Sequence, residues 1–134
     1  MNNSKLSFEP SDISVILLAE DDPDQSDMLR ESLEEEGYAV ETAFSGNVAL
    51  RRLGDRRYAA AIMDVRMPGI HGSTILIDFK ALDLKTPVIM VSAFVTPEDR
   101  EKYKRDGAAA SFSKPLDVPR LMRFLRTVTH TNTP

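Results

Sequence analysis

Cysteine is absent from this chain of 134 residues, and no apolar run approaches the length that a membrane span requires. The absence of cysteine excludes disulfides, thiolate zinc sites, iron–sulfur clusters and cysteine nucleophiles, and it is typical of a reducing compartment. The first twelve residues carry one lysine and no apolar segment, which excludes a secretory signal peptide. We therefore expect a cytoplasmic protein that makes no membrane contact.

Charged residues are common but unevenly distributed along the chain. Residues 1–36 contain 11 acidic and 2 basic side chains, residues 37–99 contain 7 of each, and residues 100–126 contain 3 acidic and 8 basic. The net charge of −4 argues against direct nucleic acid binding by this domain. The acidic and basic regions are either two solvated faces or surfaces for two different partners, and both interpretations stay open.

Five short apolar runs, typical of buried parallel strands, alternate with five helical patterns. The runs are residues 14–19, 38–43, 59–63, 87–91 and 110–113. This alternation predicts an α/β fold with one doubly wound parallel sheet and helices on both faces. We expect one domain at residues 13–128, a flexible N-terminal tail at 1–12, and a C-terminal tail or the start of a linker at 129–134.

Each predicted helix has a recognisable start. Side chains that can cap or open a helix follow each apolar run, at Asp22, Ser45, Ser73, Thr96 and Asp117. Proline follows the first and fourth of these residues, and Gly37 and Gly107 are expected to end the corresponding helices. In the first helix, the spacing places Met28, Leu29 and Leu33 on one buried face.

Polar side chains follow four of the five predicted strands, at the point where each strand ends. They are Glu20, Asp21 and Asp22 after the first strand, Asp64 after the third, Ser92 after the fourth, and Lys114 with Pro115 after the fifth. The carboxyl ends of parallel strands meet at one edge of the sheet, where ligands bind in such folds. Crowded carboxylates raise one another's pKa values unless a cation lies among them, and oxygen ligands suit Mg²⁺. Together with a hydroxyl and an ammonium, the cluster predicts a phosphoryl-binding site.

At these residues the sequence resembles the receiver domain of two-component response regulators, the CheY-like superfamily. The similarity covers residues 14–128 and is carried by four segments, Val15-Ile-Leu-Leu-Ala-Glu-Asp-Asp-Pro-Asp24, Ala61-Ile-Met-Asp-Val-Arg-Met-Pro-Gly-Ile-His-Gly72, Pro87-Val-Ile-Met-Val-Ser-Ala93 and Gly107-Ala-Ala-Ala-Ser-Phe-Ser-Lys-Pro115. The most specific motif is Asp-x-x-Met-Pro-Gly-x-x-Gly at residues 64–72. The resemblance implies a flavodoxin-like sheet with strand order 2-1-3-4-5.

The resemblance also implies a role for each polar residue of the cluster. Asp64 would be the phosphoacceptor, and Mg²⁺ would be bound by Asp21, Asp64 and the backbone carbonyl of Arg66, with Glu20 reaching the metal through water. Ser92 and Lys114 would contact the phosphoryl group, and the Lys114–Pro115 peptide bond would be cis.

The implied function is that of a signalling phosphoacceptor and not of an enzyme. A sensor histidine kinase or a phosphotransfer protein would donate the phosphoryl group to Asp64 from a phosphohistidine. The basic fourth and fifth helices would form the output face, through which a homodimer is expected. The alternative is a receiver-like docking or dimerisation module that does not depend on phosphorylation.

Two positions bear on how such a signal would leave the site. The family usually has Tyr or Phe three residues before Lys114 as part of its switch, and this chain has Ser111 there. Phe112 is expected on the opposite face of the strand, so an aromatic switch is not predicted. Arg66 either reaches over the phosphoryl group or extends into solvent, and both alternatives stay open.

Three other functions lack a feature that they require. A haloacid-dehalogenase-type phosphatase needs a second aspartate two residues after its nucleophile, where this chain has Arg66. A flavodoxin needs a Ser/Thr/Gly-rich phosphate loop after the first strand, where the acidic segment 20–22 would repel phosphate. A Rossmann dinucleotide-binding enzyme needs a Gly-x-Gly-x-x-Gly turn, which is absent.

Overall fold

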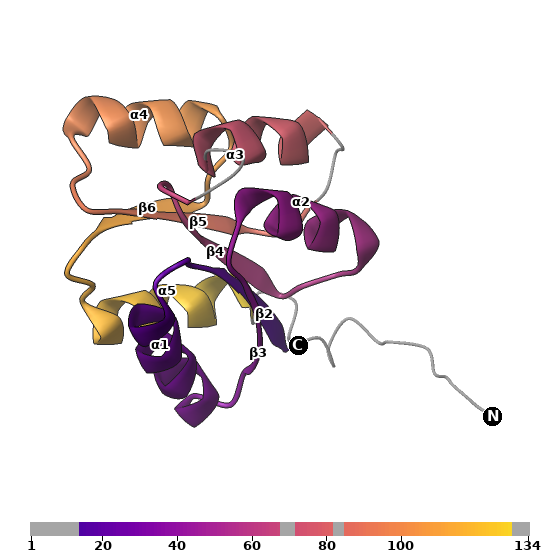
Figure 1. Cartoon of the computed structure of the whole chain (residues 1–134). Coiled ribbons are helices and arrows are strands. Elements are labelled where there is room, and N and C mark those ends of the chain that lie inside the picture. The colour runs from indigo at the N-terminus through magenta and orange to yellow at the C-terminus, as the bar shows by residue number, and fades with distance from the viewer. Residues whose placement is uncertain (1–13, 68–71, 82–84, 130–134) are drawn as a thin grey trace.

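The computed structural model describes residues 14–67, 72–81 and 85–129, and within these ranges five strands alternate with five helices (Figure 1). The strands are β2 (Val15–Ala19), β3 (Ala39–Ala43), β4 (Ala60–Asp64), β5 (Val88–Ser92) and β6 (Ala110–Ser113). The helices are α1 (Pro23–Glu35), α2 (Gly46–Asp55), α3 (Gly72–Ala81), α4 (Pro97–Arg105) and α5 (Val118–Thr129). None of these helices combines the length and apolar composition that crossing a bilayer requires.

Some sequence predictions fall on residues outside the described ranges. These are the N-terminal tail at 1–12, the part of the C-terminal tail from 130 to 134, and the Pro-Gly step of the motif at residues 64–72. Thr129, which was assigned to the C-terminal tail, is the last residue of α5.

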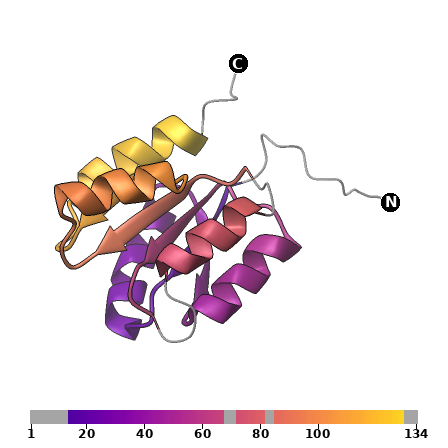
Figure 2. The ribbon, with the colours of Figure 1, turned by 90° about the horizontal axis from the view of Figure 1, so that it is seen from above.

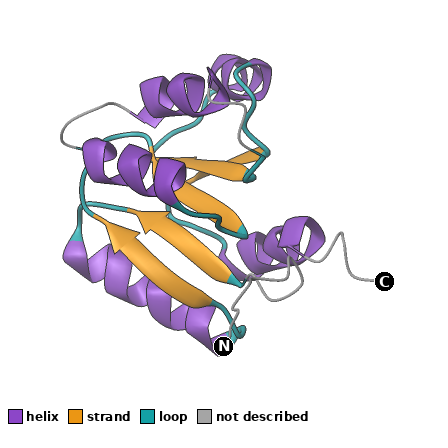
Figure 3. Cartoon of the chain, turned by 90° about the vertical axis from the view of Figure 1, so that its right-hand side faces the viewer, coloured by secondary structure: helices purple, strands orange, loops and turns teal. Residues whose placement is uncertain are grey.

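All strand pairs in the sheet are parallel, and the strand order is β3-β2-β4-β5-β6. Counted along the chain this is 2-1-3-4-5, so the expected flavodoxin-like order is confirmed. The sheet lies between two layers of helices (Figure 3), with α1 and α5 on one face and α2, α3 and α4 in a row over the other (Figures 1 and 2). The order reverses at β2, whose neighbours are β3 and β4, and a ligand crevice is expected there.

Two hydrophobic cores cover the two faces of the sheet. Leu17 and Ala19 of β2 pack toward α2, α3 and α4, whereas Ile16 and Leu18 pack toward α1 and α5. All four side chains are at most 1% exposed, because successive side chains of a strand point to opposite faces and both faces are covered. Burial on both faces explains why the central strands form continuous apolar runs in the sequence.

The predicted helix starts are confirmed at four capping residues. The Asp22 carboxylate accepts hydrogen bonds from the backbone N–H groups of Asp24 and Gln25, and Ser45 and Asp117 cap α2 and α5 in the same way. Thr96 and Asp99 form a reciprocal capping box at the start of α4. Because these caps follow the strands closely, the loops that lead into α1, α2, α4 and α5 are short.

The prediction that Met28 lies on the buried face of α1 is wrong. Its side chain is 71% exposed, whereas Leu33 is fully buried and Leu29 is partly buried. The buried stripe runs through Ser26, Leu29 and Leu33, which are three or four residues apart, and Met28 lies about 200° around the helix from Ser26. Met28 instead lines an apolar groove of about 520 Å³ between α1 and the start of α5, with Leu29, Pro115, Leu116 and Val118.

Candidate functional site

The carboxyl ends of the strands bring the predicted polar residues to one edge of the sheet. Glu20 and Asp21 directly follow β2, Asp64 and Ser92 end β4 and β5, and Lys114 directly follows β6. Because β4 is flanked by β2 and β5, Asp64 lies at the centre of this edge. The structure therefore brings together side chains that lie up to 94 residues apart in the sequence.

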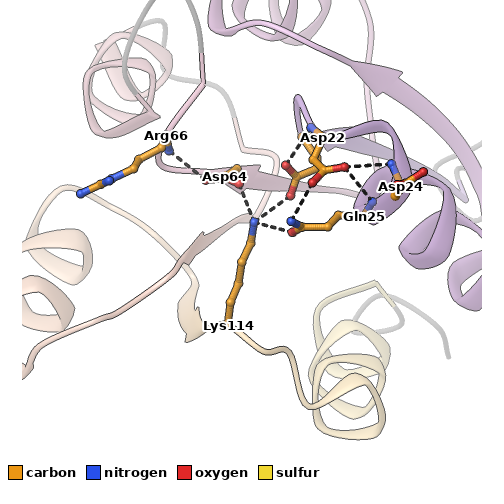
Figure 4. A network of polar contacts seen from close by, with 7 residues as sticks. Asp22, Asp24, Gln25, Asp64, Arg66 and Lys114 are labelled. Carbon is orange, nitrogen blue, oxygen red and sulfur yellow. Dashed lines mark hydrogen bonds and ion pairs between the residues drawn. The ribbon is translucent and has the colours of Figure 1, made fainter.

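Lys114 is the hub of the cluster (Figure 4). Its Nζ atom donates hydrogen bonds to Asp64 Oδ2 at 2.7 Å, to Gln25 Oε1 at 2.7 Å and to Glu20 Oε1 at 3.0 Å. An ammonium has three donor protons, so these three acceptors use all of them. The side chain is thereby held beside Asp64.

Both oxygens of the Asp64 carboxylate have hydrogen-bond donors. Oδ2 accepts from Lys114, and Oδ1 accepts from the backbone N–H of Arg66 at 2.8 Å. Asp64 is 7% exposed, as is Glu20, whose Oε2 accepts from the backbone N–H of Asp22 at 3.1 Å. The two buried carboxylates are therefore fixed in orientation, while the Arg66 side chain is exposed.

Burial and charge act in opposite directions on the titration of this cluster. Burial raises the pKa of Glu20, the Asp64 charge adds to this rise, and the hydrogen bonds from Lys114 and Asp22 reduce it. Burial also disfavours the ammonium form of Lys114, but the hydrogen bonds to Asp64 and Glu20 outweigh it, so the pKa of Lys114 is raised. Lys114 therefore carries its positive charge at neutral pH.

Three carboxylates of the cluster are arranged as a cation site would require. One oxygen from each of Glu20, Asp21 and Asp64 lies within 4.8 Å of the others, with Asp21 exposed to solvent. A single Lys114 ammonium leaves an excess of negative charge among them, which a divalent cation would neutralise. Hard oxygen donors with one side open to water fit Mg²⁺. The predicted contribution of the Arg66 carbonyl stays a prediction.

Gln25 is a member of the cluster that sequence analysis did not identify. It lies in the first turn of α1, and its Nε2 donates to Asp22 Oδ2 at 3.0 Å while its Oε1 accepts from Lys114. Its position three residues after the Asp22 cap was a signal for the first contact. The second contact joins residues that are 89 positions apart in the sequence, and no local sequence pattern predicts it.

Ser92 and Pro115 lie at the same edge of the sheet as Lys114. Ser92 is 9% exposed at the end of β5, and its backbone carbonyl accepts from the Lys114 N–H at 2.8 Å. The Lys114–Pro115 peptide bond is cis, as expected.

Ser111 and Phe112 point to opposite faces of β6, as predicted. Phe112 packs edge-to-face on Phe124 of α5, with ring centroids 6.2 Å apart. Ser111 is 8% exposed and borders a groove of about 440 Å³ that is lined by Arg100 and Tyr103 of α4, by Arg120 and Phe124 of α5, and by Phe112. The Arg100 guanidinium donates to the Ser111 carbonyl at 3.1 Å.

Comparisons with known proteins agree on one family. The family model of the response regulator receiver domain matches residues 16–126. Transcriptional regulatory protein TcrA of Mycobacterium tuberculosis is 32% identical over 113 residues, which are 84% of this chain and 45% of that protein. Transcriptional regulatory protein ZraR of Salmonella typhimurium is 32% identical over 117 residues, which are 87% of this chain and 26% of that protein. The chain thus spans less than half the length of these two relatives.

Solved structures share the fold of this chain. The receiver domain of Francisella response regulator 1452 has a TM-score of 0.86 at 24% identity, with 90% of this chain and 99% of that one covered. The receiver domain of sensor histidine kinase PA1611 from Pseudomonas aeruginosa, with a magnesium ion coordinated in its active-site cleft, has a TM-score of 0.79 at 28% identity, covering 87% and 98% of the chains. The family match, together with the order of the sheet and the polar cluster, shows that the chain belongs to the response regulator receiver domain family.

Proposed function

We propose that this chain is a phosphoacceptor in a two-component system and that Asp64 takes the phosphoryl group. The donor is the phosphohistidine of a sensor histidine kinase or of a phosphotransfer protein. Phosphorylation then changes the surface that the domain presents to its next partner. The domain assists its own phosphoryl transfer and dephosphorylation but turns over no separate substrate.

The contact of 2.7 Å between the Lys114 ammonium and Asp64 is the observation that carries this proposal. Asp64 ends a central strand and is 7% exposed, so a phosphoryl group bound to it would lie beside a cation that is already in place. Charge that is positioned before the reaction stabilises a transferring phosphoryl group without reorganisation during the step.

The transfer forms one bond and breaks one bond. An Asp64 oxygen attacks the phosphorus in line with the phosphoimidazole nitrogen, and the new P–O bond forms as the P–N bond breaks. The imidazole nitrogen keeps the electron pair of the broken bond and is then protonated from solvent. The Arg66 N–H and Lys114 hold the two carboxylate oxygens, so the nucleophile is oriented before the donor arrives.

We assign Mg²⁺ binding to Glu20, Asp21, Asp64 and the backbone carbonyl of Arg66. When bound, the ion supplies positive charge that neutralises the phosphoryl oxygens. The fold keeps the three carboxylates together, and the ammonium of Lys114 reduces the repulsion among them in the absence of the ion.

Ser92 is proposed to donate its hydroxyl to a phosphoryl oxygen and to move toward it. Because Ser111 has no ring, we expect the backbone of residues 93–96 and the start of α4 to carry the change. Two contacts support this route, since they join the same region to β6: Val95 N–H to Ser113 Oγ, and Arg100 to the Ser111 carbonyl.

The output face is proposed on α4 and α5, where a homodimer would form. Exposed basic side chains on this face are Lys102, Lys104, Arg105, Arg120, Arg123 and Arg126. Lys102 pairs with Asp106 and Arg126 pairs with Glu36, both at exposed positions where an ion pair contributes little. Lys102 and Arg126 can therefore leave these partners and pair with acidic groups of a second copy at a small cost in free energy.

Intact-mass analysis tests the phosphoacceptor assignment. The wild-type chain, incubated with acetyl phosphate and Mg²⁺, is expected to gain one phosphoryl mass, which Asp64→Asn does not gain because an amide is no nucleophile here. If Asp64→Asn gains the mass at the wild-type rate, the site is elsewhere. If the wild-type chain gains none, the docking module that does not depend on phosphorylation is the better function.

A further inference from the structure

We propose that Gln25 is a positioning residue for Lys114, and that its side-chain amide sets the rate at which Asp64 accepts a phosphoryl group; this inference rests on the proposed function. The observation behind it is the 2.7 Å hydrogen bond from Lys114 Nζ to Gln25 Oε1, which is as short as the bond from Lys114 to Asp64. Gln25 does not touch the reacting atoms and acts through the ammonium (Figure 4).

The orientation of the Gln25 amide is determined by its two partners. The Lys114 ammonium can only donate a hydrogen bond, and the Asp22 carboxylate can only accept one. The oxygen of the amide must therefore face Lys114 at 2.7 Å, and its nitrogen must face Asp22 at 3.0 Å. A rotation of the amide by 180° would break both contacts, so Gln25 holds Lys114 from one fixed direction.

Asp22 in turn is anchored by α1 itself. Its Oδ1 accepts the backbone N–H of Asp24 at 2.9 Å, so the carboxylate that holds Gln25 is the N-cap of the helix. The chain of contacts runs from this N-cap through Gln25 to Lys114 and ends at Asp64. The start of α1 is thereby connected to the proposed nucleophile.

Gln25 differs from the two other acceptors of Lys114 in what happens to it during the reaction. Asp64 becomes an acyl phosphate, and Glu20 belongs to the proposed cation site, where a metal would share its charge. Gln25 is neutral and has neither role. When a phosphoryl oxygen replaces Asp64 as partner of the ammonium, Gln25 is the acceptor that stays available to hold a long, flexible lysine side chain.

A double-mutant cycle tests whether Gln25 acts through Lys114. Gln25→Met has a similar length but only a weak thioether acceptor, Gln25→Glu keeps an oxygen acceptor, and Glu31→Met places the same side chain at an exposed position on the same helix. Gln25→Met is also made in a Lys114→Met background. Rates of phosphoryl gain are measured by intact mass over a range of acetyl phosphate concentrations with Mg²⁺, and unfolding constants are measured in urea without donor or metal.

Gln25→Met is expected to lower the maximal rate about three- to tenfold and to leave the half-saturating donor concentration unchanged within about twofold. The reason is that the ammonium stabilises negative charge that develops on the phosphoryl oxygens in the transition state. Gln25→Glu keeps an acceptor for Lys114 but loses the donor to Asp22, so it is expected to keep more of the rate than Gln25→Met, and Glu31→Met is expected to keep all of it. In the Lys114→Met background, Gln25→Met should leave the residual rate unchanged and should change the unfolding constant less than it does in the wild-type chain, because only the contact of Gln25 with Asp22 is then lost.

The inference is overturned if Gln25→Met keeps the wild-type rate, if it costs the same factor with and without Lys114, or if Glu31→Met loses as much. If the wild-type chain gains no phosphoryl mass, the proposed function fails instead. The double-mutant cycle measured by urea unfolding still tests the contact between Gln25 and Lys114. If the effects of Gln25→Met and Lys114→Met on the free energy of unfolding are additive, Gln25 does not position Lys114.

Discussion

The hydroxyl oxygen of Ser113 accepts a hydrogen bond from the backbone N–H of Val95 at 3.1 Å. Ser113 ends β6, and Val95 lies in the loop between β5 and α4, three residues after Ser92. A side chain of β6 therefore holds the loop that follows the neighbouring strand β5. Because this loop begins at the proposed phosphoryl contact, the bond lies on the route by which a change at Ser92 would reach α4.

Ser113→Ala is expected to lower the free energy of unfolding by about 1 kcal/mol, because the Val95 N–H loses its partner. Urea unfolding measures the loss, and amide hydrogen exchange at Val95 should become faster. Ser32→Ala is the control, since that hydroxyl is exposed and donates only to the Met28 carbonyl of its own helix. Unchanged exchange at Val95 would show that the bond does not restrain the loop.

Asp21→Ala is expected to abolish the rise in melting temperature that Mg²⁺ causes in the wild-type chain. A cation that binds only the folded state stabilises it by mass action, and Asp21 supplies one of the three clustered oxygens. Without metal, the variant should be as stable as the wild type or more so, because one of the crowded carboxylates is gone. Asp24→Ala, also exposed and acidic, should keep the shift. A full shift in Asp21→Ala would place the ion elsewhere.

Tyr58 is expected to make stability depend on pH in the alkaline range. Burial, together with the 2.8 Å hydrogen bond to Glu41, raises the pKa of Tyr58 from 10.0 to about 12. The folded state therefore keeps the phenol proton that the unfolded state loses. The resulting stabilisation is complete below pH 10.0 and disappears as the pH rises to about 12.

Urea unfolding of the wild type and of Tyr58→Phe across this interval measures the effect. The wild type should lose about 1 kcal/mol more than Tyr58→Phe, a modest amount because solvent screens the partly exposed Glu41. Tyr103, whose burial also raises its pKa, contributes equally to both proteins. Parallel stability curves would mean that Tyr58 does not hold its proton more tightly when folded.

Ser111→Tyr is expected to change the output of the domain and not its phosphorylation. A ring at this position would enter the groove of about 440 Å³ between α4 and α5, which Asp64 does not line. The rate of phosphoryl gain should stay within about twofold of wild type, whereas beryllofluoride, used as a phosphoryl stand-in, should cause larger changes in hydrogen exchange over residues 93–112. Identical exchange in both proteins would mean that the signal does not pass this position.

Phosphorylation is expected to promote a homodimer through α4 and α5. Sedimentation at low salt should show a larger species for the aspartyl phosphate form than for the unmodified chain, and Arg120→Glu or Arg123→Glu should weaken it. Arg51→Glu on α2, outside the proposed face, is the control with the same change of charge. A phosphorylated chain that stays monomeric at every accessible concentration would favour a different protein as the target.

The chain sequence by itself determined the elements of the fold and most members of the site. Strands that are buried on both faces must be apolar throughout, and Asp22, Ser45, Thr96 and Asp117 cap helices through bonds that span only a few residues. Glu20, Asp64, Ser92 and Lys114 could be predicted together, because all parallel strands deliver their carboxyl ends to the same edge.

The tertiary structure alone decided how these residues share their partners. Lys114 reaches three acceptors that lie 50, 89 and 94 residues away. The order and pairing of the strands bring Asp64 and Glu20 to it, whereas Gln25 reaches it only because of how α1 packs against the sheet. The same packing leaves Met28 exposed and turns Gln25 toward the lysine, although both belong to the same helix. Periodicity states which residues share a face of a helix, but only the packed neighbours determine which face is buried and which side chain meets a charge.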